Sequence, residues 1–168
     1  MNEITPDALQ QMDARYYLHP FTNHDDLHAA GTHIIERGEG VWLYDQKGRR
    51  LLDGLAGLWC VNVGYNCTEI ADAVNAQMRR LPYYPSFFNT ATEPAIRLAG
   101  KLASLAPAKL NHTIFSNSGS EANETALKLI RSYHKQRGRQ GKTKIISREF
   151  GYHGVTLATT SMTGLPGC

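Results

Sequence analysis

A short run rich in serine, glycine and small residues, SNSGSEANETALKLIR at 116–131, has the residue types needed to bind an anion. It follows an apolar run and continues as a helical pattern, so Ser118, Gly119 and Ser120 fall at a helix amino terminus. Backbone N–H groups there lack helical partners and lie at the positive end of the helix dipole. Gly119 lets a ligand approach the backbone, and both hydroxyls can donate to phosphate oxygens. The turn predicts a phosphate site, although either serine could equally serve as an ordinary helix cap.

Two familiar motifs do not fit this turn. The Walker sequence G-x-x-x-x-G-K-[ST] does not occur in the chain. The G-x-S-x-G pattern of hydrolases is not matched either, because Ser120 is followed by Glu121 and Ala122. We interpret Glu121 as a first-turn acid that the helix dipole stabilises rather than as a general base.

Seven histidines raise the question of a metal site, above all His24, His28 and His33. Spacings of four and five residues would bring them together only on one helix face. Gly31 and the polar, turn-like surroundings argue against a regular helix there, and no supporting shell of partners is visible. We interpret these residues as solvated loop histidines and expect no metal site.

The elements around the phosphate turn are those of an α/β fold. TIFS at 113–116 and TKIIS at 143–147 are predicted strands on either side of the helix, forming a parallel, right-handed βαβ unit. One face of the helix is apolar and expected to be buried, while Glu124 and Lys128 are spaced to pair on the other. The expected buried face consists of Ala122, Ala126, Leu129, Ile130 and Tyr133.

Earlier in the chain, apolar runs at 41–44 and 51–52 flank the polar turn 45–48 and predict a β-hairpin. Thr68 is placed to cap a helix that Pro82 ends. The apolar face of that helix consists of Ile70, Val74, Met78 and Leu81.

Another helix is predicted to begin at Thr92-Glu93-Pro94 and to stop before Pro107. The polar first forty residues predict a short helix and then a loop, and the segment TTSMTGLPGC at 159–168 predicts a loop. We therefore expect an amino-terminal segment with a small antiparallel hairpin at 1–60, followed by the first part of a large α/β domain at 61–168.

Composition excludes several classes of protein. The 18 basic and 15 acidic residues are scattered, with no basic run longer than a pair, so nucleic-acid binding is not favoured. No apolar run approaches the roughly 20 residues of a membrane span. Cys60, Cys67 and Cys168 form neither an even set nor a C-x-x-C pair, which argues against a disulfide framework and a zinc ribbon. We expect a cytoplasmic protein.

Two motifs in this order, SNSGSEANETALKLIR and EFGYHGVTLATTSMTG, with DGLAGLWCVNVGY before them, resemble those of the class III, or ω-amino acid, pyridoxal-phosphate-dependent aminotransferases of fold type I. HPFT and LAGLWCVNVGYN are most similar to the amine and β-alanine:pyruvate transaminases. The resemblance implies a large domain with a mainly parallel sheet and flanking helices. It covers all of this chain but roughly the first two fifths of a family member.

By this resemblance, Ser118, Gly119 and Ser120 bind the phosphate of pyridoxal 5′-phosphate at the helix amino terminus. Tyr152 would stack its ring on the pyridine, and His153 belongs to the same YHG signature. Without the preceding motif, a tyrosine after glycine would be explained as a core aromatic.

The resemblance also implies a substrate pocket. Trp59 is similar to the family residue that lines the pocket near the amine. Phe87 and Phe88 are similar to pocket residues offered to the neighbouring subunit of a homodimer or higher oligomer with its site at the subunit interface. Each of these aromatics is equally consistent with ordinary core or interface packing.

The implied activity is transfer of an amino group from a primary amine or an ω-amino acid, such as β-alanine, to pyruvate. The family lysine that forms a Schiff base with the cofactor is not among the seven lysines of this chain. We therefore expect the chain alone to be inactive and further polypeptide to complete the site. The alternatives are a non-catalytic fragment that folds or dimerises without activity, and a class III aminotransferase with a different amino donor.

Overall fold

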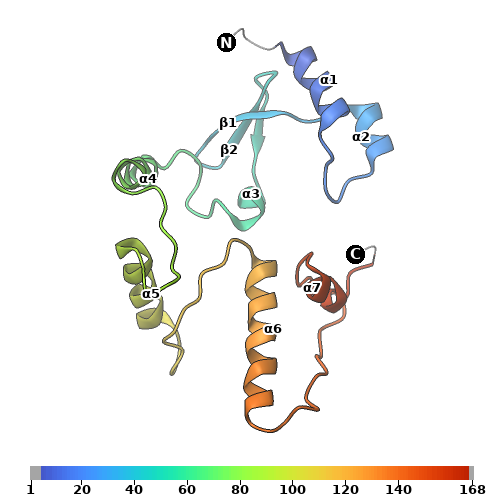
Figure 1. Ribbon diagram of the computed structural model, residues 1–168. Helices are drawn as coiled ribbons and strands as arrows, with labels where there is room; N and C mark the ends of the chain where they lie inside the picture. The colour runs from blue at the N-terminus through green and yellow to red at the C-terminus, as the bar shows by residue number, and fades with distance from the viewer. Residues whose placement is uncertain (1–4, 167–168) are drawn as a thin grey trace. The chain divides into compact units, whose positions relative to one another are not determined.

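The computed structural model describes residues 5–166 and divides into two compact units, Met1–Tyr84 and Pro85–Cys168 (Figure 1). The first unit contains helices and a small sheet, and the second consists of helices joined by extended segments. The expected division between an amino-terminal segment at 1–60 and the first part of a large α/β domain at 61–168 stays a prediction. Cys168 lies outside the described residues.

Two helices open the first unit. Helix α1, Pro6–Tyr16, is capped by the Thr5 hydroxyl. Helix α2, His24–Ala30, is capped by the Asn23 side chain, which accepts a hydrogen bond from the Asp25 amide at 3.1 Å. The loop expected over this stretch is therefore wrong, because a side-chain cap and first-turn acids stabilise even a short helix.

A three-stranded antiparallel sheet follows, with strand order β1-β2-β3. The expected hairpin is confirmed by β2, Trp42–Asp45, which pairs with β3, Arg50–Leu52. Strand β1, Ile35–Glu39, pairs with β2 on its other side and was not predicted. Its sequence IERGE lacks the alternation of apolar and polar residues that identifies a half-buried strand.

The hairpin turn is organised by Asp45, whose side chain is only 2% exposed. Its carboxylate accepts hydrogen bonds from the amides of Lys47 and Arg49 at 3.0 and 2.9 Å, and from the Arg49 guanidinium at 2.7 Å. Burial raises the pKa of Asp45, but these donors outweigh burial and hold the pKa below its usual value of 3.8. The carboxylate is thus the polar centre of the turn.

Two further helices have the expected extents but not the expected caps. Helix α4, Thr68–Arg80, begins after Cys67, so Thr68 is its first residue and the prediction that it caps the helix is wrong. Helix α5, Glu93–Leu105, begins after Thr92 and ends before Pro107 as predicted, although the Thr92 hydroxyl makes no capping bond.

In the second unit, α6, Gly119–Gln136, begins at the predicted turn. Helix α7, Leu157–Met162, occupies part of the expected carboxyl-terminal loop, so that prediction is wrong. Thr156 and Thr159 form a capping box that stabilises this helix start.

The segments 113–116 and 143–147 are not strands among the described residues, so the predicted βαβ unit is wrong for this chain. A strand exists only with a hydrogen-bonded neighbour, and neither segment has one here. Their apolar side chains remain open, with Ile146 96% exposed.

No apolar side chain is fully buried in the described part of the chain. Its three buried residues are Asp45, Gly154 and Thr159, of which Asp45 and Thr159 are fully buried. The predicted burial of the apolar face of α6 is accordingly wrong here, since Leu129, Ile130 and Tyr133 are each about half exposed. Within residues 5–166 no helix combines the length and apolar character needed to span a bilayer.

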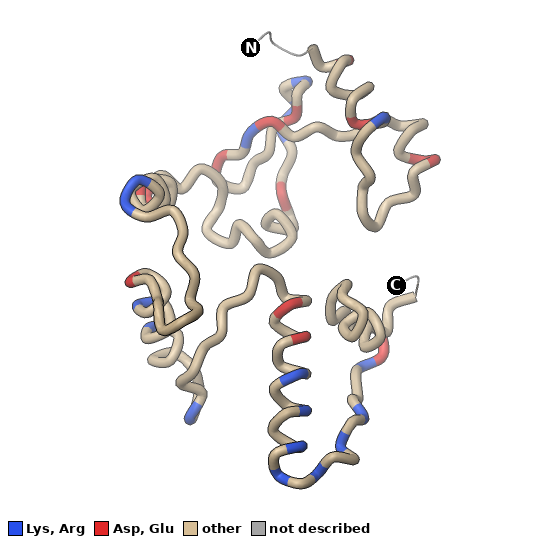
Figure 2. Tube along the Cα trace, viewed as in Figure 1, with Lys and Arg blue, Asp and Glu red and all other residues tan. Residues whose placement is uncertain are grey.

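The charged side chains of α6 are placed as the helix dipole favours, with acidic residues near its amino end and basic residues near its carboxyl end. Glu121 lies in the first turn and Lys135 in the last, and Figure 2 shows Lys and Arg gathered on the carboxyl-terminal half of α6 and on the segment after it. The expected Glu124–Lys128 ion pair is not formed among the described residues. Glu124 instead accepts a hydrogen bond from Thr156.

The buried Asp45 carboxylate predicts a pH-dependent hairpin. Because its pKa is lowered on folding, the stabilisation is complete above pH 3.8 and is lost as the pH falls through the lower folded-state pKa. Asp45→Asn should weaken the turn at neutral pH and remove this acid sensitivity. Hydrogen exchange at the Lys47 and Arg49 amides measures both effects. Asp72→Asn, at an exposed position of α4, is the control, and equal exchange in both variants would contradict the assignment.

Candidate functional site

The two serines of the phosphate turn have different roles in the structure. Ser118 is the N-cap of α6, and its hydroxyl accepts a hydrogen bond from the Glu121 amide at 3.2 Å. The Ser120 hydroxyl accepts one from the Val155 amide at 3.0 Å and caps nothing. The amides of Gly119 and Ser120 have no hydrogen-bond partner in the part of the chain that the structure describes. They are free donors at the positive end of a helix.

Glu121 supports the turn. Its carboxylate accepts hydrogen bonds from the backbone amide of Asn117 at 2.9 Å and from the Asn117 side chain at 3.1 Å. These contacts are those of a first-turn acid that orders the entry to the helix.

The segment carrying Tyr152 and His153 is tied directly to α6. The Asn123 side chain donates to the His153 carbonyl oxygen at 2.8 Å, and the Val155 amide reaches Ser120. Two of the motifs identified in the sequence, separated by about thirty residues, therefore form one structure.

Gly154 makes this close contact possible. Its φ of +132° is a conformation that residues with a side chain rarely adopt, and the residue is buried. A Cβ at this position would lie 2.5 Å from the Ser120 hydroxyl oxygen and 2.6 Å from that of Thr159. Only glycine fits between α6 and α7 here.

Gly119 presents the opposite situation. Its φ is not in the left-handed region, and a Cβ there would meet no protein atom within 4 Å. Neither backbone conformation nor packing within the chain requires glycine at 119. A group approaching the open face of the turn would require it. Free amides, a helix amino terminus and the half-exposed Tyr152 ring fit a flat, phosphorylated cofactor such as pyridoxal 5′-phosphate.

Trp59 ends an unusual turn in the first unit. Element α3, Ala56–Trp59, has positive φ at all four residues, between 48° and 64°. A left-handed conformation costs about 1–2 kcal/mol per residue other than glycine. The turn nevertheless leaves the Trp59 side chain 76% exposed. Strained backbone of this kind is concentrated at functional sites.

Asp53 holds this turn in place. Its carboxylate accepts hydrogen bonds from the amides of Leu55 and Gly57 at 2.9 and 2.7 Å, and from the Tyr65 hydroxyl at 2.6 Å. The Tyr65 hydrogen bond is the main cause that lowers the pKa of Asp53, and it raises the pKa of Tyr65. Sequence reasoning did not identify Asp53, although an aspartate two residues before a turn is a usual signal for such contacts.

Phe87 and Phe88 are also exposed. Their rings lie 6.2 Å apart between centroids, and Phe88 has a φ of +55° and is 93% exposed. The Thr90 hydroxyl contacts the Pro85 and Phe87 carbonyl oxygens and orders the loop. Core packing within this chain therefore does not explain these aromatics. No hydrogen bond or ring contact among the described residues joins them to the phosphate turn.

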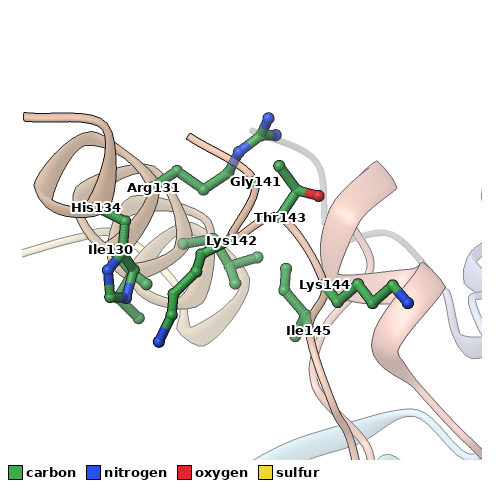
Figure 3. Close-up of a pocket in the computed structure, with 9 residues that line it drawn as sticks. Ile130, Arg131, His134, Gly141, Lys142, Thr143, Lys144 and Ile145 are labelled. Carbon is green, nitrogen blue, oxygen red and sulfur yellow. The ribbon is translucent and has the colours of Figure 1, made fainter. Parts of the chain in front are cut away.

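A cavity of about 540 Å³ lies away from these residues, between the carboxyl-terminal half of α6 and residues 141–145 (Figure 3). Ile130 and Ile145 line it together with the basic side chains of Arg131 and Lys142. None of the predicted site residues contributes to it. The described residues include no group of three or more His, Cys, Asp or Glu side chains placed to hold a metal ion.

The family model described as aminotransferase class III matches residues 24–167. The chain belongs to the class III aminotransferases. This confirms the resemblance seen in the sequence and the fold class, a fold type I α/β transferase of which this chain forms a part.

Individual class III aminotransferases are similar over nearly the whole chain. The putrescine–pyruvate aminotransferase of Pseudomonas aeruginosa is 44% identical, over 93% of this chain and 34% of that protein. The crystal structure of an (S)-enantioselective ω-transaminase from Thermomicrobium roseum has a TM-score of 0.93 at 43% identity, covering 96% of this chain and 36% of that one. The ω-transaminase of Pseudomonas jessenii, in complex with PMP, has a TM-score of 0.92 at 42% identity, over 95% of this chain and 35% of that one. The chain thus spans about a third of the length of the curated relatives it matches.

The Asp53 contacts predict that this carboxylate maintains the left-handed turn of the class III chain. In Asp53→Ala, hydrogen exchange at the Gly57 amide should accelerate, and the pKa of Tyr65 should fall back toward its usual value of 10.0. Nuclear magnetic resonance of labelled tyrosine rings measures the second effect. Asp72→Ala should change neither. An unaltered Tyr65 titration in Asp53→Ala would show that Asp53 does not hold the turn.

Proposed function

We propose that this chain forms the phosphate-binding and ring-stacking part of a pyridoxal-phosphate-dependent transaminase. The observation that carries the proposal is the junction of the phosphate turn with the Tyr152-bearing segment through the Ser120–Val155 and Asn123–His153 hydrogen bonds. It joins an anion-binding helix terminus and an aromatic platform in one unit. These are the two features that a flat phosphorylated cofactor requires.

In this proposal, each residue of the junction has a defined task. The free amides of Gly119 and Ser120 bind the phosphate, while Ser118 holds the helix terminus in shape as its cap. Tyr152 stacks on the ring, and His153 lies beside it in the same segment. Bound pyridoxal 5′-phosphate stores the amino group between two half-reactions, so that donor and acceptor react in turn.

The proposed donor is a primary amine or an ω-amino acid such as β-alanine, and the proposed acceptor is pyruvate. The similarity to a putrescine–pyruvate aminotransferase and to ω-transaminases supports this pair. Trp59, Phe87 and Phe88 are the proposed substrate-contacting residues, because they are exposed apolar rings. A γ-aminobutyrate donor is a second candidate, since the γ-aminobutyrate transaminase 1 of Solanum lycopersicum is 46% identical over 79% of this chain.

We infer that further polypeptide completes the enzyme. The relatives are about three times as long as the stretch this chain covers, and the apolar faces of α4, α5 and α6 are open to solvent. That polypeptide would cover these faces and supply the catalytic lysine. We call its combination with this chain the complete enzyme. A homodimer in the cytoplasm, with Phe87 and Phe88 directed to the neighbouring subunit, is part of the same proposal. A non-catalytic fragment is the alternative.

The direct test adds pyridoxal 5′-phosphate to the complete enzyme and follows its absorption and its trapping by borohydride. A trapped adduct, with pyruvate converted to alanine by a diamine or β-alanine, is the expected outcome. Turnover only with γ-aminobutyrate would assign the second donor. No cofactor binding by the complete enzyme would contradict the proposal and favour a non-catalytic fragment.

A substitution at Gly119 tests cofactor binding without disturbing the folding of the chain. Gly119→Ala should leave the apoprotein as stable as before or slightly more so, because alanine favours a helix over glycine by about 0.5–1 kcal/mol. The added Cβ, which meets no protein atom, should obstruct the phosphate and weaken cofactor binding at least tenfold, a loss of about 1.4 kcal/mol. Fluorescence titration of the complete enzyme measures it.

The matched control is Gly100→Ala, in the middle of α5, where a Cβ is equally unobstructed. It should gain helix stability in the same way and bind the cofactor normally. Unchanged cofactor affinity in Gly119→Ala would remove this turn from the site.

A further inference from the structure

We propose that Glu124 and Thr156 act as positioning residues that hold the Tyr152–Gly154 segment against α6 and thereby retain the cofactor. The inference rests on the proposed function. Neither residue belongs to the predicted site, and neither is expected to contact the cofactor. Their role follows from a hydrogen-bonded cluster, consisting of Glu124, Thr156 and Thr159, that links the two helices flanking the site.

The cluster begins on α6, one turn after the phosphate turn. The Glu124 carboxylate accepts a hydrogen bond from the Thr156 hydroxyl at 3.0 Å, and this hydroxyl lies 2.8 Å from that of Thr159. The Thr159 hydroxyl also accepts from the Thr156 amide at 3.0 Å, and its single proton is shared between the Thr156 hydroxyl and the Thr156 carbonyl oxygen at 3.2 Å. Each hydroxyl thus bridges two partners, which fixes its orientation.

Burial distinguishes this cluster from surface hydrogen bonds. Thr159 is 0% exposed, and both Glu124 and Thr156 are partly buried. Every apolar residue between 5 and 166 is at least partly exposed, and the most deeply buried side chain that the structure describes in the second unit is a hydrogen-bonded threonine. A hydrogen bond to a charged group that is shielded from water contributes more than a neutral, exposed one.

The position of the cluster connects it to the site. Thr156 follows Val155, whose amide binds the Ser120 hydroxyl, and Gly154, which has no room for a side chain against Ser120 and Thr159. The Glu124–Thr156 hydrogen bond is one of three that tie residues 153–156 to α6, with Val155–Ser120 and Asn123–His153. Loss of this tie would release the end of the segment opposite Tyr152.

A purely local role, capping α7, would need only the two threonines. The contact with Glu124 adds nothing to that cap, since Glu124 belongs to α6. Replacing Glu124 therefore removes the link between helices and leaves the capping box intact. This difference makes the proposal testable apart from the stability of α7.

The experiment uses the complete enzyme with pyridoxal 5′-phosphate bound, comparing wild type with Glu124→Ala, Glu124→Gln and Lys128→Ala. The readouts are the rate of cofactor release into a trapping solution, the circular dichroism of the bound cofactor's absorption band, and the thermal midpoint of the apoprotein. Glu124→Gln keeps an oxygen that can accept from Thr156. Lys128→Ala changes α6 one turn further along at an exposed position.

The expected result is release about tenfold faster in Glu124→Ala, with a weaker dichroic band and an apoprotein midpoint close to that of wild type. Lys128→Ala should stay within about twofold of wild type, a difference below about 0.5 kcal/mol. Glu124→Gln should fall between Lys128→Ala and Glu124→Ala, because its remaining acceptor is neutral. If Glu124→Ala does not fold, Thr156→Val against Thr156→Ser makes the same comparison, because serine retains the hydroxyl.

The outcomes separate the two proposals. A wild-type enzyme that binds no cofactor overturns the proposed function and this inference with it. A wild-type enzyme that binds cofactor, together with normal release and dichroism in Glu124→Ala, overturns this inference alone. Equally fast cofactor release in Glu124→Ala and Glu124→Gln would also overturn it. The remaining acceptor oxygen of the Glu124→Gln variant should preserve part of the hydrogen bond to Thr156 and slow the release.

Discussion

The second unit depends on one contact, the approach of the Gly154 backbone to the first turn of α6. This contact is close enough that a Cβ at 154 would overlap the Ser120 hydroxyl. It brings the Val155 amide to Ser120 and so converts two separated sequence motifs into a single junction. Ser120 is thereby oriented by the protein, while the adjacent amides stay free.

The described part of the chain is held together locally rather than by a hydrophobic core. Side-chain caps begin α1, α2 and α6, the Asp45 carboxylate organises the hairpin, and the Asp53 carboxylate holds a left-handed turn. Apolar faces on the longer helices remain exposed. Local polar contacts can define each element, but covering an apolar face requires a second layer. This is why the site residues are well placed within each unit although nothing packs over them.

Local signals in the sequence predicted local structure well. The hairpin, the extent of α5 and the start of α6 at the phosphate turn follow from turn, proline and capping patterns, and these were confirmed. The strands at 113–116 and 143–147 were wrong because a strand depends on a neighbour that no local pattern supplies. Helix α7 was missed because its threonines have low helix propensity, and its start depends on a capping box. The Glu124–Thr156 contact, thirty-two residues apart, has no local signal.

The threonine-centred packing beside α7 has a thermodynamic consequence. Exposing apolar surface raises the heat capacity of unfolding, whereas exposing polar surface lowers it. Since Thr159 and its hydrogen-bonded partners are polar, local opening of this region raises the heat capacity less than opening an apolar core of the same area would. The free energy of this opening therefore curves less with temperature than that of a domain held by apolar burial.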